Sequence, residues 1–346
     1  MVENYKQAFE IIKRNTQEIV DEEELLEVLK KDEPIAYWGT APTGRVHTGY
    51  LIPMAKIADF LDVGVRFKIL LANLHALLDD LKTPYELLEY RTEYYKQIVI
   101  GLLEGLGVDI SKLEFVVGTD FELSNKYSLE LLKLSSLTTF NRSKRAGAEV
   151  VRQKEDAKLG SFIYPLMQSL DVPHLSCDIA FGGIDQRGIY MLSREILPSI
   201  GYDKPVCVFN PLLPGLTGGK MSASDASSKI DCLDTPKKIK KKINKSYCPE
   251  GEVEGNGILA MVKNVIFPYL DRKDESFLID RPEKFGGQIT FATYNDLEAS
   301  FVSKNLHPAD LKQGTAKYVN QILDPVRQRF TNLEDLLKNA YPEGDN

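Results

Sequence analysis

The chain has 346 residues, of which 43% are hydrophobic and 27% are charged, with 24 glycines and 17 prolines. This composition is typical of a globular protein of about two domains, and it excludes a disordered, collagen-like or small disulfide-rich protein. The formal net charge of −7 excludes a protein that binds polyanions through its overall charge, so nucleic-acid binding would require local basic patches.

No apolar run is long enough for a membrane span, and the first 35 residues are too charged for a signal peptide. The four cysteines lack the paired spacing of a metal site and are few for this length, so we expect reduced thiols. We therefore expect a cytoplasmic protein with no membrane partner.

Residues 1–33 are predicted to form N-terminal helices, because apolar residues recur there at helical spacing among many acids. From residue 35 onward, short apolar runs alternate with longer amphipathic stretches such as 50–61 and 84–106. The runs, predicted to be strands, are 35–38, 67–72, 113–117, 178–181 and 206–209. This alternation predicts an α/β domain over 34–230 with a parallel sheet, which binds ligands at the carboxyl ends of its strands.

The segment between residues 117 and 178 is too long for one crossover and is helical in pattern, so we predict an insertion at about 119–175. After residue 230 the alternation stops. Thr235 and Pro236 are typical of a helix start. One apolar helical face is predicted from the spacing of Ala316, Val319, Leu323, Val326 and Phe330. The sequence thus predicts a mostly helical second domain over 231–346.

The first predicted strand leads into a turn, residues 39–50, with the sequence GTAPTGRVHTGY. Glycines let the backbone approach a ligand closely, and the free amides at a helix start attract an anion. His47 lies in this turn, where its ring could donate a hydrogen bond to a phosphate oxygen. The alternative for His47 is a capping or packing role.

A second loop, 216–228, follows the last predicted strand at the junction of the two domains and contains GGKMSAS at 218–224. A lysine flanked by glycines can close over a polyphosphate and neutralise charge that develops there. Lys220 is the candidate. Taken alone, this segment is equally consistent with a solvent loop.

Between these loops, Tyr164, Gln168 and Asp171 recur at spacings of four and three, so they share one face of a predicted helix that is otherwise apolar. The next strand ends in FGGIDQR at 181–187. The polar face belongs either to a ligand site or to a surface stripe, and the glycine pair either lines a site or forms a turn.

The two loops, in this order around a parallel sheet, resemble the HIGH and KMSKS motifs of class I aminoacyl-tRNA synthetases. With the third block, the sequence resembles the tyrosyl-tRNA synthetases of the archaeal and eukaryotic type along nearly the whole chain, including 281–287 and 307–312. The resemblance implies a Rossmann-like catalytic domain with a helical insertion and an α-helical C-terminal anticodon-binding domain. It also implies a tyrosine–tRNA ligase, which activates L-tyrosine with ATP to tyrosyl-adenylate and transfers it to the 3′ end of tRNA(Tyr).

The resemblance further implies the residues of the active site. For tyrosine, Tyr37 and Asp171 would hold the phenol, Tyr164 and Gln168 would bind the amino group, and Gln186 would lie nearby. For ATP, the implied residues are Gly39, Thr40, His47, Gly49, Gly182, Gly183, Asp185, Lys220, Met221 and Ser222. The predicted catalytic residues are His47, Lys220 and Gln186, the first two on the phosphates.

Attack of the tyrosine carboxylate on the α-phosphate needs positioning and charge stabilisation rather than a protein nucleophile. We therefore expect no resident metal site and no tightly bound cofactor, with Mg²⁺ arriving on the substrate ATP. The resemblance also implies a homodimer that forms through the insertion, where an apolar face lies near 129–137.

For tRNA, the resemblance implies that Phe285, His307 and Asp310 contact the anticodon and that Arg187 faces the acceptor end. Stacking of an aromatic ring on an unpaired base is the usual mode in RNA recognition, although Phe285 could also be a core residue. The basic patch at 142–154 is expected to face the acceptor end with Arg187, and the lysines at 237–245 to contact backbone phosphates, unless both patches are merely solvated helix faces.

Two positions depart from the family pattern. Ala223 stands where the family loop carries its second lysine, so the stabilisation of pyrophosphate depends more on Lys220. Asn73 stands where aspartate is usual, which removes a negative charge near the predicted pocket.

Three alternatives remain open at this point. A tryptophanyl enzyme shares the fold, but Tyr37 and Asp171 favour a phenol. An RNA-binding protein that has lost catalysis would not need His47 together with Lys220. A nucleotidyltransferase with the same two motifs would not need the helical domain.

Overall fold

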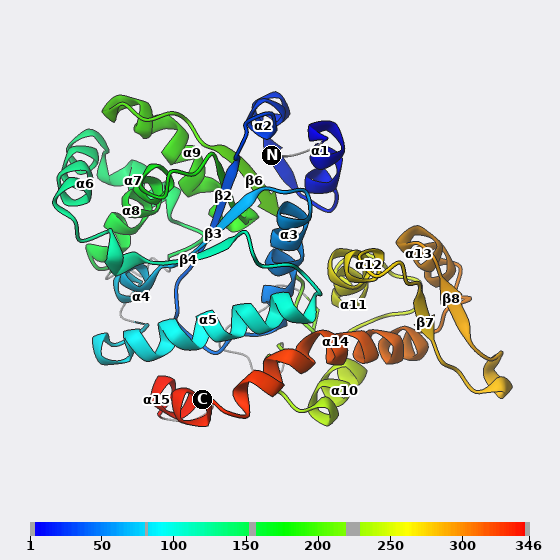
Figure 1. Ribbon diagram of the computed structural model, residues 1–346. Coiled ribbons are helices and arrows are strands. Elements are labelled where there is room, and N and C mark those ends of the chain that lie inside the picture. Colours follow the sequence, from blue (N-terminus) through cyan, green and yellow to red (C-terminus); the bar gives the residue numbers. More distant parts are fainter. Residues whose placement is uncertain (1–3, 80–81, 152–156, 219–228, 343–346) are drawn as a thin grey trace.

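The computed structural model describes residues 4–79, 82–151, 157–218 and 229–342. Six strands form one sheet in the order β1-β6-β5-β2-β3-β4 (Figure 1). The five predicted strands are confirmed as β2 (Ile35–Thr40), β3 (Arg66–Leu71), β4 (Leu113–Val117), β5 (Ile179–Gly183) and β6 (Val206–Asn210). These five run parallel to one another, which confirms the α/β fold.

The sixth strand corrects the prediction for residues 1–33. Helices α1 (Tyr5–Lys13) and α2 (Glu22–Leu29) form there as expected, but β1 (Glu18–Val20) lies between them and pairs antiparallel with β6. Three residues are too few for a periodic pattern. The strand forms because the edge of β6 offers backbone partners, beginning with the Gln17 N–H, which donates to the Phe209 carbonyl at 2.8 Å.

The strand order reverses between β2 and β5. The chain builds β2, β3 and β4 in one direction and then returns to place β5 on the other side of β2. The crevice outside the carboxyl ends at such a reversal is the usual ligand site of an open parallel sheet. Side chains of β2 alternate, so Trp38 packs on one face of the sheet and Tyr37 on the other.

Helices cover both faces of the sheet (Figure 1). One face carries α3 (Leu51–Asp62) and α5 (Leu88–Gly105), while the other is covered by α6 (Asn125–Leu137), α7 (Phe140–Ala146), α8 (Gly160–His174) and α9 (Arg187–Ile196). A short helix, α4 (Asn73–Leu78), follows β3. No helix in the described ranges has both the length and the apolar composition that crossing a membrane requires.

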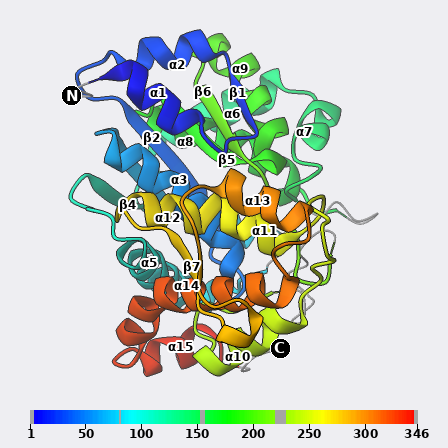
Figure 2. The ribbon, with the colours of Figure 1, turned by 90° about the vertical axis from the view of Figure 1, so that its right-hand side faces the viewer.

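The C-terminal region is mostly helical, as predicted. It contains α10 (Pro236–Lys245), α11 (Gly257–Met261), a π-helical turn (Val262–Ile266), α12 (Phe267–Asp271), α13 (Tyr294–Val302), α14 (Pro308–Phe330) and α15 (Glu334–Ala340). The sequence does not predict its antiparallel pair of short strands, β7 (Phe277–Ile279) and β8 (Ile289–Phe291). Figure 2 shows α14 running through this region between β7 and α10, with its predicted apolar face buried.

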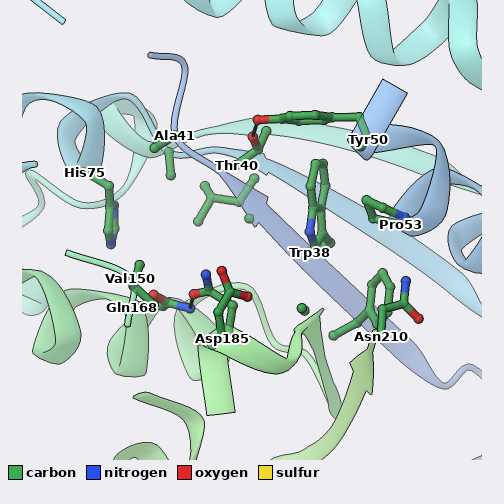
Figure 3. Close-up of a pocket in the computed structure, with 18 of the residues that line it drawn as sticks. Trp38, Thr40, Ala41, Tyr50, Pro53, His75, Val150, Gln168, Asp185 and Asn210 are labelled. Atoms are coloured by element: carbon green, nitrogen blue, oxygen red, sulfur yellow. Dashed lines mark hydrogen bonds between the residues drawn. The ribbon is translucent and has the colours of Figure 1, made fainter. Parts of the chain in front are cut away.

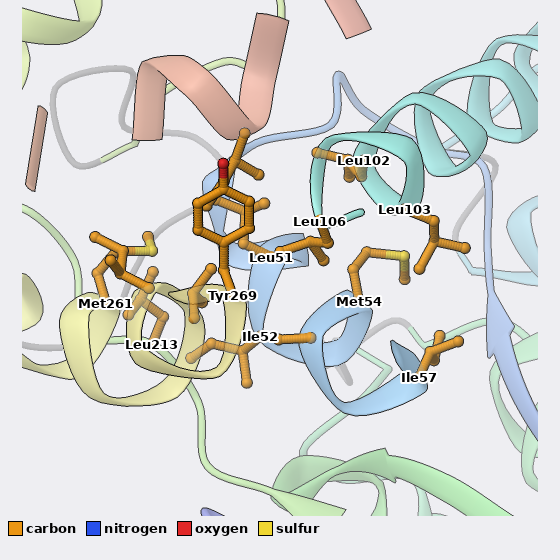
Figure 4. Close-up of a cluster of buried hydrophobic side chains, with 14 of the residues drawn as sticks. Leu51, Ile52, Met54, Ile57, Leu102, Leu103, Leu106, Leu213, Met261 and Tyr269 are labelled. Atoms are coloured by element: carbon orange, nitrogen blue, oxygen red, sulfur yellow. The ribbon is translucent and has the colours of Figure 1, made fainter. Parts of the chain in front are cut away.

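The sheet region and the C-terminal region share one apolar core. Residues of α3, α5, α11 and α12 meet in a continuous cluster, part of which is drawn in Figure 4. Helices α5 and α14 approach so closely that a Cβ on Gly105 would overlap the carbonyl of Ile322. The domain boundary at 231 stays a prediction, and no separate core marks it among the described residues.

Candidate active site

A cavity of about 440 Å³ opens at the carboxyl ends of β2, β5 and β6, where the strand order reverses. Figure 3 shows Trp38 and Thr40 of β2 facing Gln168 of α8 across it. The predicted site residues that line it are Tyr37, Gly39, Thr40, His47, Gly49, Tyr164, Gln168, Asp171, Gly182, Gly183, Asp185 and Gln186. Lys220, Met221 and Ser222 lie outside the described residues.

The deepest polar groups of the cavity are Tyr37 of β2 and Asp171 of α8, each only 1% exposed. The Tyr190 hydroxyl donates to the Tyr37 hydroxyl at 3.0 Å, and the Tyr127 hydroxyl donates to Asp171 Oδ1 at 2.8 Å. Burial raises the pKa of Tyr37 well above its usual range, so its hydroxyl stays protonated. Tyr37 therefore presents a neutral hydroxyl beside a carboxyl group.

The sequence analysis missed both tyrosines that hold these two groups. Tyr190 lines the cavity and follows Gln186 by four residues on α9, so helical periodicity could have placed it on the same face. Tyr127 carries no such signal, because it reaches Asp171 from the inserted helix α6 and only the packing of α6 on α8 brings them together.

The polar face of α8 points into the protein. Tyr164 and Asp171 are buried, so the surface-stripe alternative is wrong. The Gln168 side chain donates through Nε2 to Gln186 Oε1 at 3.0 Å, which joins α8 to the start of α9. These groups form one polar wall of the cavity.

The glycine pair that ends β5 allows this wall to form. A Cβ on Gly182 would lie 3.1 Å from the Gln186 side chain, and one on Gly183 would lie 2.5 Å from Asp185 Oδ1. Side chains at these two positions would therefore push Gln186 and Asp185 from their places. The pair is more than a turn, because it lines the cavity and lets two polar side chains fold back beside it.

Asn210, the last residue of β6, is a lining residue that the sequence analysis missed. It is buried, and neither atom of its side-chain amide has a hydrogen-bond partner among the described residues. A polar residue directly after a predicted strand was the available signal, because the carboxyl ends of parallel strands meet at one edge.

His47 caps a 3-10 turn, as its capping alternative predicted, and it also lines the cavity, while its contact to a phosphate stays a prediction. It precedes a 3-10 turn, Thr48–Tyr50, that leads into α3, and its Nδ1 accepts a hydrogen bond from the Gly49 N–H at 3.2 Å. Burial, with a smaller effect of Lys229, lowers the pKa of His47 to about 4. At neutral pH the ring is therefore uncharged, and its proton lies on Nε2.

The turn around His47 is joined to the segment that follows the second loop. The Thr48 N–H donates to the Ile230 carbonyl at 2.8 Å, and the Cys232 N–H donates to the Val46 carbonyl at 3.0 Å. Arg45 Nε forms an ion pair with Asp231 Oδ2 at 2.9 Å. The segment that follows the second loop therefore lies against the turn that carries His47.

Asn73 does not line the cavity. Its Oδ1 accepts hydrogen bonds from the backbone N–H groups of Leu74 and Thr119, and its Nδ2 donates to Thr119 Oγ1 at 3.1 Å. The side chain thus anchors the start of α4 to the turn after β4. This contact is structural, and it accounts for an uncharged residue at this position.

The described part of the chain has one cluster of donor groups close enough for a metal ion, made of His75, Glu122 and Asp171. The two ring nitrogens of His75 face different carboxylates, Nδ1 toward Glu122 and Nε2 toward Asp171. The cluster therefore has the geometry of an ion-pair network, with the imidazole between two carboxylates.

The predicted anticodon residues lie on one surface of the C-terminal region. Phe285 ends a 3-10 turn and is 62% exposed, so the core-aromatic alternative is wrong. His307 caps α14 by accepting from the Ala309 N–H, and Asp310 lies in its first turn. Arg281 contacts Asp310 at 3.4 Å and donates to the Gly287 carbonyl, which ties the Phe285 turn to α14.

Two other residues that were predicted to contact tRNA form ion pairs within the protein. Arg187 forms a two-pronged ion pair with Glu18 of β1, and Arg142 pairs with Glu195. Helix α10 buries two isoleucines and exposes most of its lysines. Two members of the 142–154 patch, Arg152 and Lys154, lie outside the described residues.

Helix α6 exposes the predicted apolar face. Leu132 is 65% exposed, and Leu129 and Leu137 are also exposed, while Leu134 packs inward. Together with Ser199 and Ile200, these leucines line a broad hollow on the surface of the insertion. The apolar face predicted near 129–137 is therefore exposed.

Comparison with known proteins identifies the class that this fold and cavity define. A family model described as tRNA synthetases class I (W and Y) matches residues 29–324. The chain therefore belongs to the class I tRNA synthetases for tryptophan and tyrosine.

Relatives within the class identify the amino acid. The chain is 49% identical over 337 residues to the tyrosine–tRNA ligase of Haloarcula marismortui, covering 97% of each protein. It is 46% identical to the cytoplasmic tyrosine–tRNA ligase of Saccharomyces cerevisiae, covering 97% of this chain and 88% of the relative. A crystal structure of the tyrosyl-tRNA synthetase of Archaeoglobus fulgidus, complexed with L-tyrosine, superposes with a TM-score of 0.88 at 41% identity, covering 94% of this chain and 99% of that one.

The activity is that of a tyrosine–tRNA ligase, with tyrosine, ATP and tRNA(Tyr) as substrates. This confirms the resemblance found in the sequence. It also removes the tryptophanyl, non-catalytic and nucleotidyltransferase alternatives.

Proposed function

We propose that the cavity at the carboxyl ends of β2 and β5 is the site where this tyrosine–tRNA ligase forms tyrosyl-adenylate. The observation that carries the proposal is that Tyr37 and Asp171, from different elements, are both 1% exposed and line one cavity. A buried hydroxyl and a buried carboxylate suit the phenol of the substrate, which can donate to Asp171 and accept from Tyr37. The amino group then faces Tyr164, Gln168 and Gln186.

ATP would occupy the remainder of the cavity. The glycine backbone at Gly39, Gly182 and Gly183 leaves room for adenosine beside Thr40, Gly49 and Asp185. His47 would donate from Nε2 to a phosphate oxygen. Lys220, with Met221 and Ser222, would act on the phosphates from the second loop, and Mg²⁺ would enter with ATP as part of that substrate.

In the first step, a carboxylate oxygen of tyrosine attacks the α-phosphorus and forms a bond to it. The bond between that phosphorus and the oxygen bridging to the β-phosphate breaks, and pyrophosphate leaves. In the second step, a ribose hydroxyl at the 3′ end of the tRNA attacks the carbonyl carbon, and AMP leaves. Neither step requires a protein nucleophile, so catalysis comes from positioning and charge stabilisation.

A structure with L-tyrosine bound tests the proposed orientation. The phenolic oxygen is expected within hydrogen-bond distance of both Tyr37 and Asp171. Pyrophosphate exchange into ATP, measured with each amino acid separately, should show a signal with tyrosine. A phenol pointing away from these two residues would contradict the proposal.

We also propose that Phe285, His307 and Asp310 contact the anticodon, and that Arg187, the 142–154 patch and the α10 lysines contact the tRNA elsewhere. Asp310 is held by Arg281 and has a second carboxylate oxygen free to accept from a guanine edge. On binding tRNA, Arg187 would either break its ion pair with Glu18 or contact Glu18 and the tRNA at the same time.

Replacing Asp310 by alanine should lower the kcat/KM of tRNA charging by roughly 10- to 100-fold, because one base contact is lost. Tyrosine-dependent pyrophosphate exchange should stay unchanged, since the cavity is remote from α14's first turn. Asp324→Ala is the matched control, as an exposed acid on the same helix. Equal losses in both assays would mean that Asp310 is structural.

We propose that two copies of the chain associate through the α6 leucines, since an isologous contact buries the same patch on both copies. Leu132→Asp should convert a dimer into a monomer of 39.0 kDa in sedimentation analysis, because it places a charge in an apolar interface. Val302→Asp, at an exposed apolar residue of α13, should leave the dimer intact. A Leu132→Asp protein that stays dimeric would place the interface elsewhere.

The cytoplasm is the proposed location, and its support is the printed name of the Saccharomyces cerevisiae relative.

A further inference from the structure

Three ionisable side chains are buried together at the cavity, two of which, His75 and Asp171, line it, while Glu122 does not. His75 lies on α4, Glu122 lies just after β4 and a 3-10 turn, and Asp171 lies on α8, each at most 3% exposed. His75 Nδ1 lies 3.4 Å from Glu122 Oε1, and His75 Nε2 lies 3.4 Å from Asp171 Oδ2. The imidazole therefore stands between two carboxylates, and the proposed reaction uses neither the imidazole nor Glu122.

Because the cluster is buried, any net charge that it carries is costly in free energy. Two ionised carboxylates beside a neutral imidazole would place two negative charges in the protein interior, which is very costly. Within the described ranges, no lysine or arginine lies within ion-pair distance of Glu122 or Asp171. A proton on His75 is therefore the available compensation, and it places a positive ring 3.4 Å from an oxygen of each carboxylate.

The surroundings support a charged imidazole. Although burial lowers the pKa of His75, the attraction of Asp171 and Glu122 outweighs it and the net shift is upward. From α8, the Tyr164 ring meets the imidazole edge-on at 4.7 Å, and from α6 the Tyr127 hydroxyl binds the other oxygen of Asp171. Asp79, one turn along α4, forms its own ion pair with Lys82.

Asp171 depends on this imidazolium. Burial has the largest effect on the pKa of Asp171 and raises it, as does the nearby Glu122, while His75 is the strongest of the groups that lower it, followed by the Tyr127 hydrogen bond. Without the positive ring, the carboxyl group would hold a proton more readily and lose the partner that fixes Oδ2. Its ability to accept the phenol hydrogen bond would then weaken.

We propose that His75 is a positioning residue for tyrosine selection: as an imidazolium between Glu122 and Asp171, it opposes the effect of burial on the Asp171 carboxyl group, and so favours the ionised form that accepts the substrate phenol. Glu122 is the anchor that fixes the other side of the ring. This inference rests on the proposed function, in which Asp171 binds the phenol.

The titration of His75 tests the inference without any substrate. The chain has four histidines, so their ring signals can be separated by NMR after ¹⁵N-histidine labelling and assigned with His75→Gln. Glu122→Gln keeps the shape of the side chain and removes one of the two charges. It should lower the titration midpoint of His75 by about one pH unit. His47, whose pKa of about 4 is set by burial and Lys229, is the internal control and should not move.

Kinetics supply the second test. His75→Gln should raise the KM for tyrosine about tenfold, the usual effect of losing a charged hydrogen-bond partner, with the KM for ATP as internal reference. In Glu122→Gln, the KM for tyrosine should begin to rise at a lower pH than in the parent, since His75 loses its proton earlier. In the double variant, Glu122→Gln should add nothing, because it acts through His75.

Several outcomes would overturn the inference. The first is a titration midpoint of His75 that Glu122→Gln does not change. The second is an effect of Glu122→Gln on the KM for tyrosine that persists in the double variant. The third is an equal change in the KM values for tyrosine and ATP in His75→Gln. If His75→Gln fails to fold, the titration of Glu122→Gln still decides. An unchanged tyrosine KM in Asp171→Ala would instead refute the proposed phenol contact itself, so the two failures are distinguishable.

Discussion

Replacing Asp171 by alanine is expected to lower the ratio of tyrosine to phenylalanine activation by roughly 100-fold, measured as kcat/KM in pyrophosphate exchange. The physical reason is that the buried Asp171 and Tyr37 are both paired by the phenol of tyrosine and left unpaired by phenylalanine. Tyrosyl-tRNA synthetases are themselves the reference case for this effect, with discrimination of about 10⁵ against phenylalanine. Removing one of the two polar groups should therefore reduce the discrimination against phenylalanine without eliminating it.

The ratio should change from both sides. The kcat/KM for tyrosine should fall because its phenol loses a partner, and that for phenylalanine should rise because this substrate no longer leaves Asp171 unpaired. Ser169→Ala is the matched control, because Ser169 is buried on the same helix, bonds to Ser193 and lies outside the cavity lining. An unchanged ratio in Asp171→Ala would remove Asp171 from the tyrosine site.

Replacing His47 by asparagine is expected to lower kcat for adenylate formation by roughly 10²- to 10³-fold, the usual cost of losing one donor to a developing charge. The asparagine Oδ1 can still accept from the Gly49 N–H, so the cap observed for Nδ1 is preserved. The donor at the Nε2 position is lost. Thermal unfolding should therefore stay near that of the parent while single-turnover adenylate formation slows.

His47→Gln supplies the complementary variant. Its side-chain amide extends toward the Nε2 position, so part of the rate should return. Because the pKa of His47 is about 4, its ring should stay uncharged from pH 6 to 9, and it should contribute no step to the rate over that range. A kcat unaffected by His47→Asn would reduce His47 to its capping role.

The features of this protein that depend on local sequence pattern could be predicted from the sequence. Apolar runs bounded by glycine or polar residues predicted the five parallel strands, and the glycines and histidine after the first strand predicted a ligand-binding turn. The spacing of Tyr164, Gln168 and Asp171 predicted a shared helical face, because a helix repeats every 3.6 residues. Resemblance to a family then assigned the chemistry.

The sequence alone did not distinguish a buried face from an exposed one. Tyr164 and Asp171 could have formed a surface stripe, and Phe285 could have been a core residue; burial decided both. The short strands β1, β7 and β8 carry no periodic signal, since their pairing depends on partners remote in the sequence.

Local pattern in this chain determined which segments become strands and helices and which loops approach a ligand, because those properties depend on residues a few positions apart. Only the tertiary structure decided that Tyr190 would hold Tyr37, that Tyr127 would hold Asp171, and that His75 would stand between two carboxylates. These contacts join residues 44 or more positions apart on separate elements. Their energies depend on the packing that excludes water, and no local pattern records that packing.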